Sequence, residues 1–172
     1  MNSKEQQEAE FRSFTAAHRT TLRRQAYLLC GDWYQADDLV QTALVKLFAA
    51  WRRVEPGGAP AYARRIVLNV FFSHRRLAWV RRERASSDTP PRRIEAPQLG
   101  VDARLDVIEA LAALPPRQRA TVILRFCEDL SVEETALALG CSTGTVKSQT
   151  AKGLKRLREV LARPAVTAST ER

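Results

Sequence analysis

The chain has 172 residues, of which 45% are hydrophobic, with 28 Lys or Arg against 19 Asp or Glu. This length allows one or two small domains, and the hydrophobic content is sufficient for packed cores, which excludes a disordered chain. The net charge of +9 favours nucleic acid or another acidic surface as the partner. Charge alone is weak support for this, because many basic proteins bind no specific anion.

Helical periodicity predicts three helices in residues 1–84. The first spans residues 5–30 and ends at Gly31, and the second follows the capping residue Asp32 and runs to about residue 54. Pro60 opens the third, where its fixed φ and missing N–H cost nothing. Helical spacing turns the following side chains toward a core: Phe11, Phe14, Leu22, Ala26, Leu29, Trp33, Ala36, Val40, Ala43, Leu47, Trp51, Tyr62, Ile66 and Val70.

The third helix mixes aromatic residues with arginines. Residues 55–84 hold seven Lys or Arg against two acidic residues, a net charge of +5. Phe71, Phe72 and Trp79 cannot all point inward together with Ile66 and Val70. Two interpretations stay open: the aromatic rings stack on exposed bases while the arginines follow phosphates, or the rings are core and the arginines are solvated.

Composition changes after residue 84, where Ser, Pro and Gly interrupt any helix, so residues 85–103 are predicted to be a flexible linker. A second domain is expected over residues 104–163, followed by a disordered tail over 164–172. Its first helix stops at Pro115, and a short helix follows with Val122, Ile123 and Phe126 inward. Strand signals are almost absent, so the predicted fold is all-α, with two small helical domains.

Residues 131–158 have the outline of a helix-turn-helix. Ser131 can cap the first helix with Glu134 as its capping-box partner, and Gly140 supplies the positive φ that ends it. Ser142 caps a second helix, in which Val146, Thr150, Leu154, Leu157 and Leu161 form one stripe. The second helix of this motif normally enters the DNA major groove.

The opposite stripe of that second helix carries Thr145, Ser148, Lys152 and Lys155. Residues 143–158 contain five Lys or Arg and no acidic residue. Solvated faces usually mix both signs of charge, so this face favours a polyanionic partner. The alternative is an amphipathic helix that only closes a bundle.

The sequence gives little support for a metal site, a cofactor site or a membrane segment. Cys30, Cys127 and Cys141 form no Cys-x-x-Cys pair, and His18 and His74 lie far from metal-ligand spacing, so we expect no metal and no cofactor. The cysteines are expected to be small buried residues, with a redox switch as the alternative. A polar beginning and the absence of a long apolar stretch predict a cytoplasmic protein without membrane insertion.

Three motifs, in order, make the chain resemble an extracytoplasmic-function sigma factor of bacterial RNA polymerase, with features of an actinobacterial sigma-E-like subgroup. The first is DDLVQ at 37–41, followed by Leu47 and Phe48. The second is AYARRIVLN at 61–69, followed by Arg75 and Arg76. The third runs from Leu114 through the helix-turn-helix to Arg158. Tyr62 departs from the family's usual Trp, a difference that bears on the base preference more than on the activity.

The resemblance implies a sigma factor that binds core polymerase, recognises the −10 and −35 promoter elements and helps to open the −10 region. It implies a core polymerase contact through Asp38, Gln41, Thr42 and Phe48. It implies −10 contacts through Asn69, at a pocket for a flipped base, and through Phe72, Arg75, Arg76 and Trp79. It implies −35 contacts through Ser142, Thr143, Thr145, Lys147, Ser148, Lys152 and Lys155. An anti-sigma factor is a further implied partner.

Two other functions fit the sequence less well. A helix-turn-helix regulator that acts without polymerase would need a dimerisation or ligand-binding module, whereas the N-terminal half is a basic, aromatic-rich helical unit. A nuclease or polymerase needs clustered carboxylates for metal ions, and the adjacent Asp37 and Asp38 diverge around a helix. We therefore expect no enzymatic activity and no catalytic residue.

Overall fold

Local signals in the sequence set the ends of the helices. Asp32 caps a helix by accepting hydrogen bonds from the backbone N–H groups of Tyr34 and Gln35. Ser131 and Glu134 form the reciprocal capping box, and Gly140 ends that helix in the left-handed conformation with φ of 62°. The expected positions of these caps are therefore confirmed.

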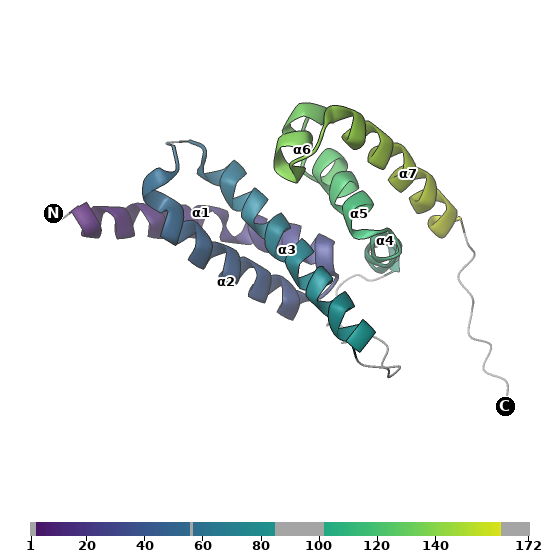
Figure 1. Cartoon of the computed structure of the whole chain (residues 1–172), viewed down its shortest axis with the longest axis horizontal. Helices are drawn as coiled ribbons and strands as arrows, with labels where there is room; N and C mark the ends of the chain where they lie inside the picture. The colour runs from purple at the N-terminus through teal and green to yellow at the C-terminus, as the bar shows by residue number, and fades with distance from the viewer. Residues whose placement is uncertain (1–2, 56, 85–101, 163–172) are drawn as a thin grey trace.

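The computed structural model describes residues 3–55, 57–84 and 102–162, and all their regular structure is helical (Figure 1). The predicted linker and tail lie outside the described residues, apart from residues 102 and 103, which open a helix. The helices are α1 (Ser3–Cys30), α2 (Trp33–Ala50), the 3-10 turn η1 (Trp51–Arg53), α3 (Ala59–Arg84), α4 (Asp102–Ala112), α5 (Pro116–Val122), the π-helical turn η2 (Ile123–Cys127), α6 (Val132–Leu139) and α7 (Thr143–Leu161).

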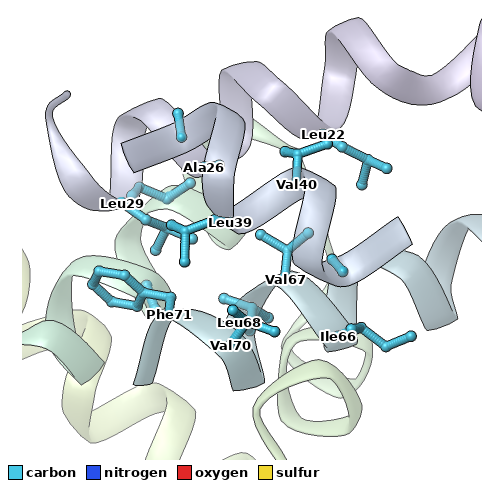
Figure 2. Packing of buried hydrophobic residues seen from close by; sticks show 14 of the residues in the cluster. Leu22, Ala26, Leu29, Leu39, Val40, Ile66, Val67, Leu68, Val70 and Phe71 are labelled. Atoms are coloured by element: carbon cyan, nitrogen blue, oxygen red, sulfur yellow. The ribbon is translucent and has the colours of Figure 1, made fainter. Parts of the chain in front are cut away.

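Helices α1, α2 and α3 pack into one bundle, in which buried residues from all three meet (Figure 2). Leu29 and Leu39 are fully buried there, together with Val67 and Phe71 of α3. Burying an aliphatic or aromatic side chain of this size stabilises the fold by roughly 1.5–3 kcal/mol. The inward stripe of α3 therefore fixes which of its other residues point away from the bundle.

Helices α4 to α7 form the second unit, where α7 packs on α5 and α6. Val146 is buried and anchors the start of α7, while Leu114, Ile123 and Leu124 fill the interior. The second unit lies beside α3, as Figure 1 shows, and buried residues of both units belong to one continuous cluster. The all-α fold with a helix-turn-helix is thus confirmed, and the two units are in contact.

Some side chains lie differently from the prediction. Tyr62 and Phe126, both expected inside, are exposed, as is Leu161 at the end of α7. Tyr62 lies in the first turn of α3 and is 41% exposed, and Phe126 lies in the π-helical turn, where the residue spacing differs from that of an α-helix. Cys127 is exposed, whereas Cys30 and Cys141 are half-buried, so burial of all three cysteines was a wrong expectation.

Gly153 allows α7 to approach α5 closely, and its replacement by Ala is expected to destabilise the chain. A Cβ atom there would lie 2.7 Å from Cγ2 of Val122 and 3.5 Å from Cδ2 of Leu114. Alanine gains about 1 kcal/mol over glycine in a helix, but overpacking costs about 1–3 kcal/mol, and the stiff β-branched valine cannot turn away. We expect thermal unfolding about 2–4 °C lower.

Gly144→Ala is the matched control for this variant, because a Cβ at Gly144 would meet only Ser142 Oγ, at 3.8 Å. Its melting temperature, measured by calorimetry, is expected to be unchanged or higher. A Gly153→Ala protein as stable as the wild type would contradict the close packing of α5 and α7.

Candidate nucleic-acid interface

The first turn of α7 is held in place by its cap. The backbone N–H of Thr145 donates to Ser142 Oγ at 3.1 Å, and the two hydroxyl oxygens lie 2.9 Å apart. This arrangement satisfies a free N–H of the helix start and limits the rotation of both side chains. The polar groups at the start of α7 are therefore ordered before any partner binds.

The outer face of α7 is polar and cationic. Its predicted −35 residues are all exposed, namely Ser142, Thr143, Thr145, Lys147, Ser148, Lys152 and Lys155. Buried Val146 and Gly153 lie on the inner side and fix the rotation of the helix. Without an acidic residue before Glu159, this face can attract phosphates and present hydroxyl and ammonium groups to base edges.

A groove beside α3 gathers the predicted −10 residues. It has a volume of about 770 Å³, and its walls include Asn69, Phe72, Arg75, Arg76 and Trp79. Their side chains differ in exposure: Phe72 is half-buried, whereas the other four are exposed. Phe71 belongs to the core, as one of the two interpretations expected, whereas Trp79 is exposed and its stacking on bases stays a prediction. An amide, aromatic faces and guanidinium groups together suit a single nucleic-acid strand.

Further groove residues were absent from the predicted −10 set. Arg82 and Ser73 of α3 contribute, and the other wall comes from the second unit through Pro115, Pro116, Arg117 and Leu139. The guanidinium carbon of Arg117 lies 5.2 Å from the centre of the Phe72 ring. Helical spacing could have added Arg82, but no local signal places Arg117 beside α3.

A third surface runs along the outer side of α2. Asp38, Gln41 and Phe48 are exposed on one stripe, and Thr42 is half-buried at its edge. Tyr34 and Val45, which are 76% and 66% exposed, complete the stripe, although they were absent from the predicted set. A helical projection opposite the core positions of α2 could have found both. Large apolar side chains beside polar ones at the surface are typical of a protein-binding face.

Asp37 differs from its neighbour Asp38 because it is already paired. Arg23 of α1 donates from Nε to Oδ1 of Asp37 at 2.6 Å and from Nη2 to Oδ2 at 3.0 Å. These bonds hold the pKa of the Asp37 carboxyl below its usual range. The Arg23 guanidinium also lies 4.5 Å from the Trp33 ring, so Arg23 joins α1 to α2 through both Asp37 and Trp33, whereas Asp38 is exposed.

A metal site and a membrane-spanning helix are two further features that a chain of this kind can carry. In residues 3–55, 57–84 and 102–162, no group of three or more His, Cys, Asp or Glu side chains is arranged to hold a metal ion. Over the same ranges, no helix combines the length and apolarity needed to cross a membrane.

Comparison with known proteins identifies both units. Sigma-70 region 2 matches residues 14–81, and sigma-70 region 4 matches residues 104–157. The RNA polymerase sigma-E factor of Streptomyces coelicolor is 37% identical over 159 residues, covering 88% of this chain and 86% of that protein. The ECF RNA polymerase sigma factor SigE of Mycolicibacterium smegmatis is 36% identical over 152 residues, covering 85% of this chain and 59% of that protein.

A solved structure resembles the chain over a similar extent. The sigma factor RpoE of Bartonella quintana, in complex with the anti-sigma factor NepR, is 29% identical with a TM-score of 0.76, covering 88% of this chain and 96% of that one. A region 2 followed by a region 4 defines a promoter-recognition class of transcription protein. The chain belongs to the extracytoplasmic-function sigma factors of RNA polymerase. Such a protein directs the initiation of transcription, which is not a catalytic role.

Proposed function

We propose that this sigma factor divides promoter recognition among three surfaces. The outer stripe of α2 binds core RNA polymerase, the α3 groove binds one strand of the −10 element, and the outer face of α7 reads the −35 element as duplex. The observation that carries the proposal is the convergence of Asn69, Phe72, Arg75, Arg76 and Trp79 on one groove. Because core polymerase works in the cytoplasm, the protein is expected to act there.

The chemistry of the −10 step needs no catalytic group. Flipping a base out of the stack costs a few kcal/mol, and stacking on an aromatic ring returns roughly 1–3 kcal/mol per base. Trp79 offers an exposed ring for this, while Arg75 and Arg76 can follow the phosphates beside it. The Asn69 amide offers both a donor and an acceptor to a base edge.

The −35 step relies on duplex contacts. Exposed Lys147 and Lys152 can pair with phosphates, and Thr145 and Ser148 can hydrogen-bond to base edges. Because the cap orders the start of α7 in advance, little side-chain freedom is lost there on binding. This half of the proposal predicts a steep loss of affinity with salt.

An anti-sigma factor is a further proposed partner. RpoE of Bartonella quintana, which resembles this chain over most of its length, was solved with the anti-sigma factor NepR. We propose that a protein of the same class binds this chain and withholds it from polymerase.

Replacing Asn69 by Ala is expected to change the −10 preference of transcription. The experiment is multiple-round transcription by core polymerase and the chain from a promoter library randomised in the −10 element. Loss of a bidentate partner at one base should relax selection there by about 1–3 kcal/mol, or roughly 5- to 150-fold. His74→Ala, another exposed position of α3 that does not line the groove, is the control. An unchanged selection profile would remove Asn69 from the base pocket.

A further inference from the structure

We propose that the groove between α3 and the second unit is a binding site for a free nucleotide, which is an aromatic base carrying at least two phosphate groups. The binding itself does not require the −10 role of the groove, whereas the competition with a promoter strand described below rests on that proposed function. The charge, the aromatic rings and the size of the groove carry the proposal.

Four guanidinium groups line the groove. Arg75, Arg76 and Arg82 come from α3, and Arg117 comes from the first turn of α5. All four side chains are exposed, and among the described residues that line the groove there is no Asp or Glu. Cations from two units therefore face one space, where a multiply charged anion would compensate them.

A fifth cation lies within the influence of this group. Arg119 of α5 is only 4% exposed, and its Nη1 donates to the backbone oxygen of Leu29 at 2.5 Å. Burial, followed by the charge of Arg75, lowers the pKa of Arg119 to about 10, so this guanidinium is still charged at neutral pH. The positive potential at the groove is thus larger than its lining residues alone provide, and a bound anion would reduce the repulsion.

The arginines of α3 are spread along the groove. Arg76 and Arg82 are six residues apart in one helix, so their Cα atoms lie about 9 Å apart along its axis. Guanidinium groups bind phosphate oxygens in pairs through a planar fork of N–H donors. Cations spread over such a distance match a chain of phosphates better than a single phosphate group.

Aromatic rings lie among these cations. Phe72 is half-buried and Trp79 is 60% exposed, and both line the groove together with the amide of Asn69. The guanidinium carbon of Arg117 lies 5.2 Å from the centre of the Phe72 ring. Aromatic faces stack on bases, and an amide offers a donor and an acceptor to a base edge. Groups suited to a base and groups suited to phosphates therefore lie side by side.

The size of the groove suits a small molecule. Its volume of about 770 Å³ lies within the range of roughly 300–1,000 Å³ that is typical of ligand pockets. One wall is α3, and the other is formed by Pro115, Pro116 and Leu139 of the second unit. Ligand sites are often found between two such units, and this volume favours a single nucleotide over a long strand.

The proposed ligand would compete with promoter DNA. A nucleotide stacked on Phe72 or Trp79 and held by Arg75 and Arg76 uses the groups that we assign to the −10 strand. The concentration of free nucleotide would therefore set how much of the chain can bind a −10 strand.

The ligand class is tested by isothermal titration calorimetry of the full chain with ATP, GTP and inorganic tripolyphosphate. We expect one nucleotide per chain, bound at least about tenfold more tightly than tripolyphosphate, because only the nucleotides have a base to stack. Tripolyphosphate that bound as tightly as ATP and GTP would overturn the assignment to a nucleotide. Absence of binding by ATP and GTP would overturn the site.

The location is tested with Arg117→Ala, which is expected to weaken ATP binding about tenfold or more through the loss of a charged hydrogen-bond donor. Arg53→Ala removes the same charge at an exposed position that does not line the groove, and it should bind ATP as the wild type does. Equal affinities for these two variants would place the nucleotide elsewhere.

The stacking is tested by tryptophan fluorescence. ATP should quench the emission of the wild-type chain, and this quenching should be lost in Trp79→Phe but retained in Trp51→Phe. Trp79 is exposed, so its replacement leaves the core intact. Quenching that persisted unchanged in Trp79→Phe would overturn the contact between the base and this ring.

A competition experiment separates this inference from the proposed function. A labelled single strand of the −10 sequence, followed by fluorescence anisotropy, should be displaced from the wild-type chain by ATP. If ATP bound but the strand did not, the −10 role of the groove would fail while the nucleotide site would stand. If the strand bound and ATP neither bound nor displaced it, the nucleotide site would fail while the proposed function would stand.

Discussion

Replacing Val45 by Arg is expected to weaken binding to core polymerase by about 10- to 100-fold, or roughly 1.4–2.8 kcal/mol. Val45 is two-thirds exposed on the outer stripe of α2, between Gln41 and Phe48, so the substitution leaves the core of the bundle untouched. A charged side chain at the centre of an interface must be desolvated without a partner, and it also holds the two surfaces apart. Titration of a fluorescent chain with core polymerase measures the effect.

Thr20→Arg is the matched control for this variant. Thr20 is exposed on α1, on the side of that helix opposite buried Leu29, at roughly 100° per residue. It adds the same charge outside α2 and is expected to leave the affinity nearly unchanged. Equal losses for both variants would indicate a general charge effect, and no loss for Val45→Arg would place the polymerase contact on another surface.

Replacing Lys147 and Lys152 together by Ala is expected to lower affinity for a −35 duplex about tenfold or more near physiological salt. Both side chains are exposed on the cationic face of α7, and each phosphate contact releases condensed counterions. The slope of log K against log salt should therefore fall by about 1.8, or roughly 0.9 for each lost contact. Anisotropy titrations over a range of salt concentrations measure this slope.

The control replaces Lys4 and Lys46 by Ala, which makes the same change of net charge outside α7. This variant should keep the wild-type slope. If the two double variants changed the slope equally, the duplex would be held by the diffuse charge of the whole chain, and the outer face of α7 would lose its proposed role.

Much of the fold follows from signals that act over a few residues. The cap at Asp32, the capping box of Ser131 with Glu134, and the left-handed Gly140 are local chemistry, and the structure has them where the sequence predicts. The core stripes of α2 and α7 follow from helical spacing, as buried Val40 and Val146 illustrate. These same stripes determine which residues remain outside, so most candidate site residues could be placed from the sequence.

The contacts between the two units could not be predicted in this way. An arginine is among the least buried residue types, yet Arg119 is enclosed because three backbone oxygens surround its guanidinium group. The pairing of Arg64 with Glu128 joins positions 64 residues apart, and neither neighbourhood contains a sign of the other. Such contacts depend on how the whole units meet, which periodicity does not encode.

The helical spacing of apolar residues also gave a wrong prediction of burial at two positions, one near the start of α3 and one in the π-helical turn η2. Tyr62 was assigned to the core from its place on α3, but there the bundle has no neighbour to cover it. Phe126 lies in the π-helical turn η2, whose larger number of residues per turn rotates side chains away from the α-helical position. Only the error at Phe126 comes from applying one helical period beyond the stretch that obeys it, because Tyr62 lies within the α-helix α3.

The most direct measurement of the central account is transcription in vitro by bare core polymerase on fragments of bacterial genomic DNA, with the 5′ ends of the products sequenced. Adding the purified chain should create a set of start sites, preceded by two shared sequence elements at constant spacing, that are absent without it. If Val45→Arg still produced this set in full, or if the wild-type chain produced no new start sites, the assignment of α2, α3 and α7 to one promoter-bound complex would be wrong.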